Sequence, residues 1–260
     1  MKIGTLSFGR VGDDFDLGSE RREKIANLAK KRGAKGVELL VCAGHAVESR
    51  KDVDWLADRV KRANIRMNIL TETQFDRLDH DQSGASYHIM YWLDSSGNVS
   101  ILGKQHFARS SELNGDDGIE MLGNFERVID SRIVDFAENY KIFTLCCGEL
   151  NILLGRNGVT CRSEAARKKI ESATIILNPT HDRMGNGGTL NAKRGWLSGN
   201  GRVAVSVSNW DHSEGQPRGQ QGPSETLHTV YQDGQRLKLV DSEGGKSCGY
   251  VYREWEVDLK

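Results

Sequence analysis

The sequence predicts an α/β protein in which β-sheets pack face to face and helices cover the outside. Strand and helix patterns alternate over the first 71 residues, a polar hairpin turn lies near residue 96, and several short apolar strands fill the C-terminal half. Strands therefore outnumber helices, which favours layered sheets over a helical bundle.

The N-terminal part alternates strand, helix, strand, helix and strand. An almost unbroken apolar run at residues 37–43 is typical of a central strand covered on both faces. Before it, Ser19 is placed to cap a helix with apolar residues at helical spacing, and Gly33 is a suitable stop. The expected elements are strand 1–9, helix 20–32, strand 37–43, helix 52–63 and strand 65–71.

Antiparallel pairing is expected from the hairpin onward. Strands at 87–93 and 99–102 flank an Asp-Ser-Ser-Gly-Asn turn. The further expected elements are strands at 125–129, 141–147, 174–178, 203–209, 227–231, 237–240 and 250–258, helices at 162–172 and 190–197, a turn or short helix at 131–139, and a Gly/Gln-rich loop at 215–222. No internal repeat is present.

Composition narrows the function classes. Lys plus Arg and Asp plus Glu number 36 each, so no net field favours nucleic acid or an anionic membrane. No apolar run approaches the roughly 20 residues that span a bilayer, and the N-terminus lacks the pattern of a signal peptide. With three prolines and no low-complexity linker, we expect a single cytoplasmic domain over residues 1–260.

The five cysteines indicate free thiols. Their number is odd and they lack paired CxxC spacing, so neither a disulfide framework nor a zinc knuckle is predicted. Phosphate-loop and HExxH motifs are also absent. We therefore expect no metal and no cofactor.

Five segments carry the functional signal, and they occur in a fixed order. Residues 97–107 form a hairpin that contains Lys104, and Glu112 stands eight residues later. Residues 143–149 lead from a strand into Cys147, residues 175–181 contain Asn-Pro-Thr, and residues 205–209 close on an Asn. Together these segments resemble the carbon-nitrogen hydrolase, or nitrilase-like, superfamily across most of the chain.

The resemblance implies a four-layer α-β-β-α sandwich of the nitrilase type, which dimerises through its outer helices. It implies hydrolysis of a non-peptide carbon-nitrogen bond, in an amide more than a nitrile, by a homodimer or larger homo-oligomer. The residues that match the family's catalytic positions are Cys147 as nucleophile, Lys104 as the catalytic lysine and Glu112 as a supporting carboxylate. The expected substrate-binding residues are Gly148, Glu149, Asn178 and His181.

One element of the family pattern is missing. The strand at residues 37–43 leads into Ala43 and Gly44 where members have Pro-Glu, and that Glu is the family's general base. A missing general base typically costs about 10²- to 10⁴-fold in rate. The candidates to compensate are Glu112, Glu48, Glu72 and His45.

A thiol nucleophile needs a base or a cation beside it. One positive charge about 4 Å away stabilises a thiolate by about 4 kcal/mol at an effective dielectric of about 20. The sequence offers Lys104 for this role and for holding an oxyanion, with help from the backbone N–H after Cys147. Cys146 should point to the opposite face of the strand as an inert thiol.

Two functions from different classes remain open. The first is a thiol hydrolase that forms an acyl-enzyme on Cys147. The second is a catalytically impaired relative that keeps the pocket and binds a ligand or a protein partner, as the Gly at position 44 favours. On this second interpretation Glu149 caps the turn, and Asn178 and Asn209 bond backbone groups only.

Overall fold

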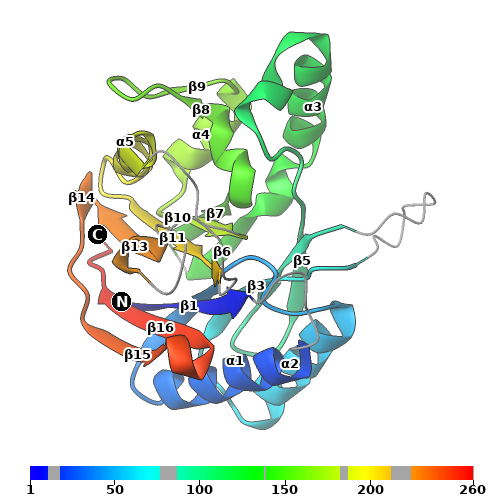
Figure 1. Ribbon diagram of the computed structural model, residues 1–260, viewed down its shortest axis with the longest axis vertical. Coiled ribbons are helices and arrows are strands. Elements are labelled where there is room, and N and C mark those ends of the chain that lie inside the picture. Colours follow the sequence, from blue (N-terminus) through cyan, green and yellow to red (C-terminus); the bar gives the residue numbers. More distant parts are fainter. Residues whose placement is uncertain (11–17, 77–86, 138, 182–186, 212–223, 260) are drawn as a thin grey trace.

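The structure is a computed structural model that describes residues 1–10, 18–76, 87–137, 139–181, 187–211 and 224–259. Two large β-sheets make up its centre (Figure 1). The predicted loop at 215–222 lies outside the described residues. Within them, no helix is long and apolar enough to cross a membrane.

The first sheet is built mainly by the N-terminal part of the chain and has the strand order β15-β16-β1-β2-β3-β4-β5, with β12 paired to β1. Its strands are β1 (Lys2–Arg10), β2 (Val37–Cys42), β3 (Asn68–Glu72), β4 (Ile89–Leu93), β5 (Val99–Lys104), β12 (Trp210–Asp211), β15 (Asp241–Gly245) and β16 (Tyr250–Glu256). β1, β2 and β3 are parallel, and α1 (Gly18–Gly33) and α2 (Arg50–Arg62) connect them. The expected hairpin is the antiparallel pair β4 and β5.

The second sheet has the order β14-β13-β11-β10-β7-β6. Its strands are β6 (Ile133–Ala137), β7 (Tyr140–Thr144), β10 (Ile175–Thr180), β11 (Val203–Ser208), β13 (His228–Gln232) and β14 (Gln235–Arg236). The helices in this half are α3 (Gly115–Arg127), α4 (Glu164–Ser172) and α5 (Gly187–Leu197), and β8 (Leu153–Leu154) pairs with β9 (Thr160–Cys161). Short 3₁₀ helices span Ser110–Leu113, Ile129–Arg132, Cys147–Ile152, Glu225–Leu227 and Lys246–Cys248.

Alternating side chains divide the interior into layers. In β2, Leu39 and Val41 face the second sheet, whereas Leu40 packs against the helices outside. In β10, Leu177 joins the core between the sheets and Ile176 joins the cluster on the opposite face. α1 and α2 cover the first sheet, and α4 and α5 lie on the far side of the second (Figure 1). The predicted four-layer α-β-β-α sandwich is confirmed.

The predicted strand at 125–129 is wrong, because these residues lie in and just after α3. The buried side of this helix includes Gly118 and Phe125, seven residues apart, with Met121 and Leu122 partly buried between them. This is helical spacing. Glycines at 115, 118 and 123 lower helix propensity, which masked the pattern in the sequence.

Two smaller predictions are also wrong. The turn or short helix expected at 131–139 is largely β6, in which Val134 and Phe136 alternate toward the core between the sheets. The strand expected at 237–240 does not form, since Leu239 and Val240 are exposed and have no sheet face to cover. Periodicity detects apolar side chains but not whether a partner strand is there to receive them.

Candidate active site

Cys147 lies on a sharp turn directly after a strand of the second sheet. β7 ends at Thr144, so the strand predicted to reach residue 147 stops three residues earlier, and Cys147 begins a short 3₁₀ helix. Its φ is +33°, a region that residues other than glycine rarely occupy and that is common at functional sites. The following residue, at position 148, must be glycine, because a Cβ there would lie 2.1 Å from the Ala108 carbonyl oxygen. The Cys147 side chain remains partly exposed.

Glu149 holds this turn from inside. Its Oε2 accepts the Cys146 backbone N–H at 2.8 Å, and its Oε1 accepts the His106 backbone N–H at 2.9 Å. Arg132 Nη2 donates to the same Oε1 at 2.8 Å, and both side chains are completely buried. Burial raises the pKa of Glu149, while Arg132 and the two backbone donors oppose that rise. Glu149, expected to bind substrate, thus has both oxygens engaged by the protein.

Asn178 supports the same turn from β10. Its Nδ2 donates to the Leu145 carbonyl at 2.8 Å and to the Cys147 carbonyl at 3.3 Å. The Asn178 side chain therefore fixes the backbone of the turn, as the structural interpretation of the sequence anticipated. Asn209 plays a similar part, because its Nδ2 donates to the Gly44 carbonyl at 2.6 Å and its Oδ1 accepts the Phe8 N–H at 2.9 Å.

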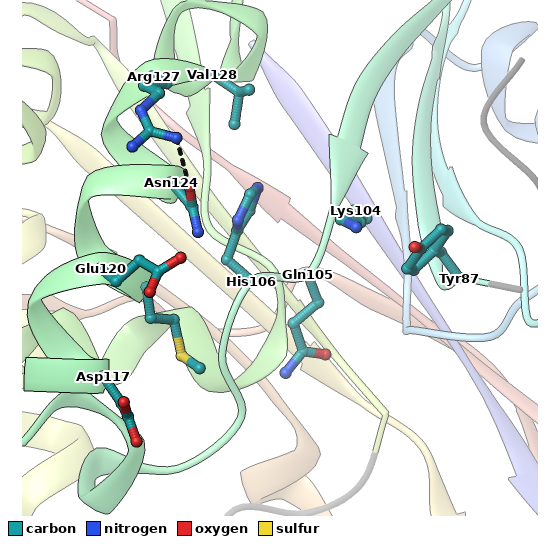
Figure 2. Close-up of a pocket in the computed structure, with 10 residues that line it drawn as sticks. Tyr87, Lys104, Gln105, His106, Asp117, Glu120, Asn124, Arg127 and Val128 are labelled. Atoms are coloured by element: carbon teal, nitrogen blue, oxygen red, sulfur yellow. Dashed lines mark hydrogen bonds between the residues drawn. The ribbon is translucent and has the colours of Figure 1, made fainter. Parts of the chain in front are cut away.

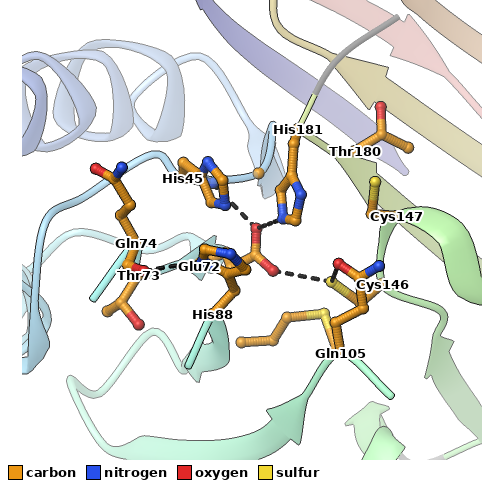
Figure 3. Close-up of polar contacts among 12 residues, drawn as sticks. His45, Glu72, Thr73, Gln74, His88, Gln105, Cys146, Cys147, Thr180 and His181 are labelled. Carbon is orange, nitrogen blue, oxygen red and sulfur yellow. Dashed lines mark hydrogen bonds and ion pairs between the residues drawn. The ribbon is translucent and has the colours of Figure 1, made fainter. Parts of the chain in front are cut away.

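A buried carboxylate, Glu72, lies at the centre of the site (Figure 3). It is the last residue of β3. Its Oε2 accepts His181 Nε2 at 2.7 Å and the His45 backbone N–H at 3.0 Å, and its Oε1 accepts Cys146 Sγ–H at 2.8 Å. Glu72 therefore links the first sheet to the cysteine turn of the second.

Glu72 and His181 form an ion pair. Burial alone would raise the pKa of Glu72, but the charge and hydrogen bond of His181 lower it to about 2. Burial alone would lower the pKa of His181, but Glu72 and a side-chain hydrogen bond to Cys147 raise it to about 11. In Figure 3 the Cys147 side chain lies beside His181. The three side chains form a chain from sulfur to imidazole to carboxylate.

The two neighbouring cysteines differ in their surroundings. Cys146 is fully buried, and burial followed by the negative charge of Glu72 raises its pKa well above the usual value. A protonated Cys146 thiol is consistent with its role as donor to Glu72. The sequence placed Cys146 as an inert thiol on the opposite face, whereas the structure places it in the same cluster, because the chain has already left the strand at Thr144.

Two further histidines complete the cluster. The His45 ring stacks on the His181 ring with centroids 3.7 Å apart, and the His88 ring lies 4.2 Å from His45. His88 Nδ1 is 2.8 Å from the Gln74 carbonyl oxygen, so that nitrogen carries the proton. Of the residues proposed to compensate for Gly44, His45 and Glu72 lie in the site.

Lys104 faces a neighbouring cavity. Its ammonium lies 3.6 Å from the centre of the Tyr87 ring, and within the described residues it forms no hydrogen bond with Cys147. Both side chains line a cavity of about 720 Å³ between the end of β5 and α3 (Figure 2). Gln105 lines this cavity too, and its Oε1 is 4.0 Å from Cys146 Sγ. Gln105 therefore connects the lining of the cavity with the cysteine cluster.

The remaining predicted carboxylates lie outside the cluster. Glu112 Oε2 accepts the backbone N–H groups of Ala108 and Arg109 at 2.7 and 3.2 Å. It thereby fixes the segment that packs on Gly148. Glu48 is exposed, and its backbone N–H is bonded to Asp52.

Comparison with solved structures identifies the fold. The NitN amidase from Nesterenkonia sp. AN1 superposes with a TM-score of 0.57 at 13% identity, over 100% of this chain and 93% of the amidase. A mutant of that amidase in complex with butyramide gives 0.57 at 12% identity, over 98% and 90% of the two chains. Another of its structures describes an amidase of the nitrilase superfamily. The chain has the nitrilase fold.

Sequence comparisons add nothing to this result, since no protein-family model and no curated protein matches the chain. A further structure of the same amidase, with acrylamide added at its active-site cysteine, gives a TM-score of 0.55 at 14% identity over 100% and 93% of the chains. At such identities the likeness establishes the nitrilase fold alone. The single domain expected over residues 1–260 stays a prediction.

Gly44 leaves the space that the Glu72–His181 pair occupies in this version of the nitrilase fold. A Cβ at position 44 would lie 2.3 Å from His181 Cδ2 and 2.6 Å from Glu72 Oε2. The backbone there is also fixed, because the Gly44 N–H donates to the Thr180 carbonyl at 3.0 Å and so joins the two sheets. A larger residue at 44 and the Glu72–His181 pair therefore exclude each other.

We expect Gly44→Ala to lower stability by about 1–3 kcal/mol, because it overpacks a buried site. Displacing His181 by about 1 Å should also slow alkylation of Cys147 about 100-fold. Chemical unfolding and the rate of iodoacetamide labelling measure the two effects. The matched control is Gly123→Ala in α3, where a Cβ meets no atom within 4 Å. Unchanged labelling in Gly44→Ala would show that the packing around position 44 does not position His181.

Sequence reasoning missed the central pairing of this site. The sequence indicates His181 as a substrate-binding residue and Glu72 as a candidate to compensate for Gly44, but it does not indicate that the two are in contact. Each follows or ends an apolar strand, and such strand ends commonly carry functional side chains. The missing information was that the ends of β3 and β10 meet across the two sheets of the nitrilase fold.

Proposed function

We propose that the protein is a thiol hydrolase that cleaves a non-peptide carbon-nitrogen bond, in a small amide, through an acyl-enzyme on Cys147. The observation that carries the proposal is the position of Cys147 beside the Glu72–His181 ion pair (Figure 3), on a backbone turn with a φ of +33° at the cysteine. A nucleophile bonded to a base that is itself oriented by a carboxylate is the arrangement that thiol hydrolysis requires. Glu72 supplies the carboxylate that Gly44 lacks.

The first half of the reaction forms the acyl-enzyme. Cys147 Sγ, as the thiolate paired with the imidazolium of His181, attacks the amide carbon, and the carbonyl electron pair moves to oxygen. The backbone N–H of Gly148 is the proposed donor to that oxyanion. When the tetrahedral species collapses, the carbon-nitrogen bond breaks. His181 gives its proton to the leaving nitrogen, and ammonia or an amine departs.

The second half releases the acid. Water attacks the thioester carbon while neutral His181 takes a proton from the water, and the carbon-sulfur bond then breaks. The carboxylic acid leaves and the Cys147–His181 pair is restored. Glu72 remains ionised throughout and holds His181 Nε2 at 2.7 Å, which leaves Nδ1 of the ring for sulfur and substrate.

Other predicted residues take supporting roles in this proposal. Asn178 and Glu149 hold the backbone of the cysteine turn. Glu112 positions the segment beneath Gly148. Lys104, expected from the resemblance to hold the oxyanion, has its ammonium over the Tyr87 ring. We propose that it contacts the part of the substrate that fills the adjacent cavity (Figure 2).

The proposed partner is a small molecule. Balanced charge gives no reason to expect nucleic acid. The fold neighbour whose structure contains butyramide supports an amide as the first substrate class to test. A homodimer and a cytoplasmic location remain part of the proposal, because they rest on the sequence alone.

Incubation with a library of short amides, followed by intact-mass analysis, tests the proposal. We expect an acyl adduct on wild-type protein and on Cys146→Ser, and none on Cys147→Ser. Cys146→Ser is the matched control because it changes the adjacent thiol and leaves Cys147 in place. A Cys147 that stays unmodified with every amide, in a protein that nevertheless binds one of them, would favour the impaired, ligand-binding relative.

Lys104→Met tests the role of the lysine. If the ammonium contacts substrate in the cavity and not the sulfur, iodoacetamide should label Cys147 in this variant within about 3-fold of the wild-type rate. KM for an amide identified in the library should rise about tenfold or more, as expected when a substrate-binding contact is removed. If labelling of Cys147 is instead slowed by about 100-fold in this variant, the Lys104 ammonium acts on the Cys147 sulfur.

A further inference from the structure

Three donor side chains converge on one point in the cysteine cluster. They are His45 after β2, Glu72 at the end of β3 and His181 after β10, and their ligand atoms lie within 4.8 Å of one another. All three side chains are largely buried: the exposed fraction is 8% for His45 and 1% for Glu72, and 13% for the His181 side chain. The reaction proposed above uses Glu72 and His181 but assigns no step to the His45 ring.

We propose that His45, Glu72 and His181 form a binding site for a divalent transition-metal ion of the zinc class. Two imidazoles and one carboxylate are a ligand set that binds Zn²⁺ and related ions, whereas Ca²⁺ and Mg²⁺ prefer sites made of oxygen alone. The sequence analysis expected no metal, because it looked for cysteine pairs and HExxH spacing. The three donors here come from separate strand ends.

The geometry requires the three donors to draw closer together. Donors about 2.0–2.2 Å from one ion in a tetrahedral site lie about 3.3–3.6 Å apart, so donor atoms as far as 4.8 Å from one another need to approach by about 1.2–1.5 Å. Cys146 Sγ, 2.8 Å from Glu72 Oε1, is the nearest candidate for a fourth ligand. Figure 3 shows the rings of His45 and His181 turned toward the carboxylate.

The surroundings orient these donors. The His45 ring is stacked on the His181 ring at a centroid distance of 3.7 Å and lies tilted against the His88 ring at 4.2 Å. His88 is itself held by the Gln74 carbonyl. Such outer contacts fix ligand rings in metal sites and usually matter for metal affinity. Gly44 keeps the space between the donors free of a side chain of its own.

Metal binding and the proposed hydrolysis compete for the same atoms. The ion takes the lone pair of His181 Nε2, which now carries the proton bonded to Glu72. His181 and Glu72 then coordinate the ion and no longer pair as imidazolium and carboxylate beside Cys147. A bound ion should therefore inhibit the reaction. This consequence rests on the proposed function, while the binding site itself does not.

Titration with Co²⁺ and Zn²⁺ tests the site. The full-length Cys147→Ala variant is used, so that Cys147 contributes no ligand. We expect one equivalent of Co²⁺ to give visible absorption bands that Zn²⁺ abolishes. His45→Gln should weaken Zn²⁺ binding, measured against a chromophoric chelator, about 100-fold or more, because even outer-shell changes cost 10–100-fold. The matched control is His106→Gln, whose ring lies against Phe125 outside the cluster and whose loss should leave affinity unchanged.

Absence of binding to Cys147→Ala, or equal affinity in His45→Gln and His106→Gln, would overturn the proposal. If His45→Gln does not fold, X-ray absorption of the zinc-loaded Cys147→Ala protein decides, since a shell of sulfur and water alone contradicts a site with two imidazoles. A separate measurement follows labelling of Cys147 in the wild type, where Zn²⁺ should slow iodoacetamide and EDTA should restore the rate. If the protein binds metal but forms no adduct with any amide, the proposed hydrolase function is wrong and the proposed metal site is still supported.

Discussion

Replacing His181 with Gln is expected to slow both the acylation and the iodoacetamide labelling of Cys147 about 10²- to 10⁴-fold. Gln keeps a donor for Glu72 but carries no positive charge and transfers no proton. The sulfur therefore loses the cation that pairs with it, and the leaving nitrogen loses its acid. The measurements are pseudo-first-order labelling rates near pH 7 and adduct formation by mass.

The control for this variant is His88→Gln. His88 belongs to the same group of rings, but its Nδ1 is bonded to the Gln74 carbonyl, and the contacts that define the catalytic chain pass through His181. Its labelling rate should stay within about 3-fold of wild type. Equal rates in all three proteins would mean that His181 only fills space beside Cys147, and the proposed mechanism would fall.

Glu149→Gln is expected to lower the free energy of unfolding by about 3–5 kcal/mol. The change removes the negative charge that faces Arg132 at 2.8 Å in a fully buried pair, and breaking such a pair leaves an uncompensated buried charge. The amide of Gln also has an NH2 donor in place of one acceptor oxygen. Because both Glu149 oxygens accept backbone N–H groups, one of these hydrogen bonds is lost as well. Urea or guanidinium unfolding measures the loss.

The matched comparison is Asp58→Asn, which removes the partner of Arg62 in an exposed pair four residues apart on α2. Exposed pairs of this kind contribute about 0.3–0.5 kcal/mol. A loss below about 1 kcal/mol in Glu149→Gln would show that water reaches Arg132 in the variant. In that case Glu149 would not be the fixed support of the cysteine turn described above.

The fold was largely predictable because burial leaves a direct trace in sequence. The run at residues 37–43 is apolar at every position except Glu38, and β2 is indeed covered on both faces by helices and by the second sheet. The polar turn at 94–98 specified the hairpin of β4 and β5. Prediction failed at residues 125–129, where glycines weakened the helical signal and β-branched and aromatic residues suggested a strand.

The site was predictable only in part. The position of Cys147 near the end of a strand could be anticipated, because the largely apolar run at residues 142–147 is followed by Gly148 and Glu149. The contacts of Cys147 could not, since they depend on how two separate sheets are placed against each other. Lys104 illustrates the limit: its ammonium lies 3.6 Å from the centre of the Tyr87 ring, a contact that the sequence pattern did not indicate.

The hydrogen bonds of Glu72 cross from one sheet to the other. Glu72 ends a strand of the first sheet, while Cys146 and His181 follow strands of the second. Any substitution in the interior that slides one sheet over the other by a fraction of an ångström must stretch these short bonds, even where it leaves the melting temperature nearly unchanged. The reactivity of Cys147 should therefore report on how the two sheets are aligned, and conservative changes in the core between the sheets, such as at Val203, should alter this reactivity first.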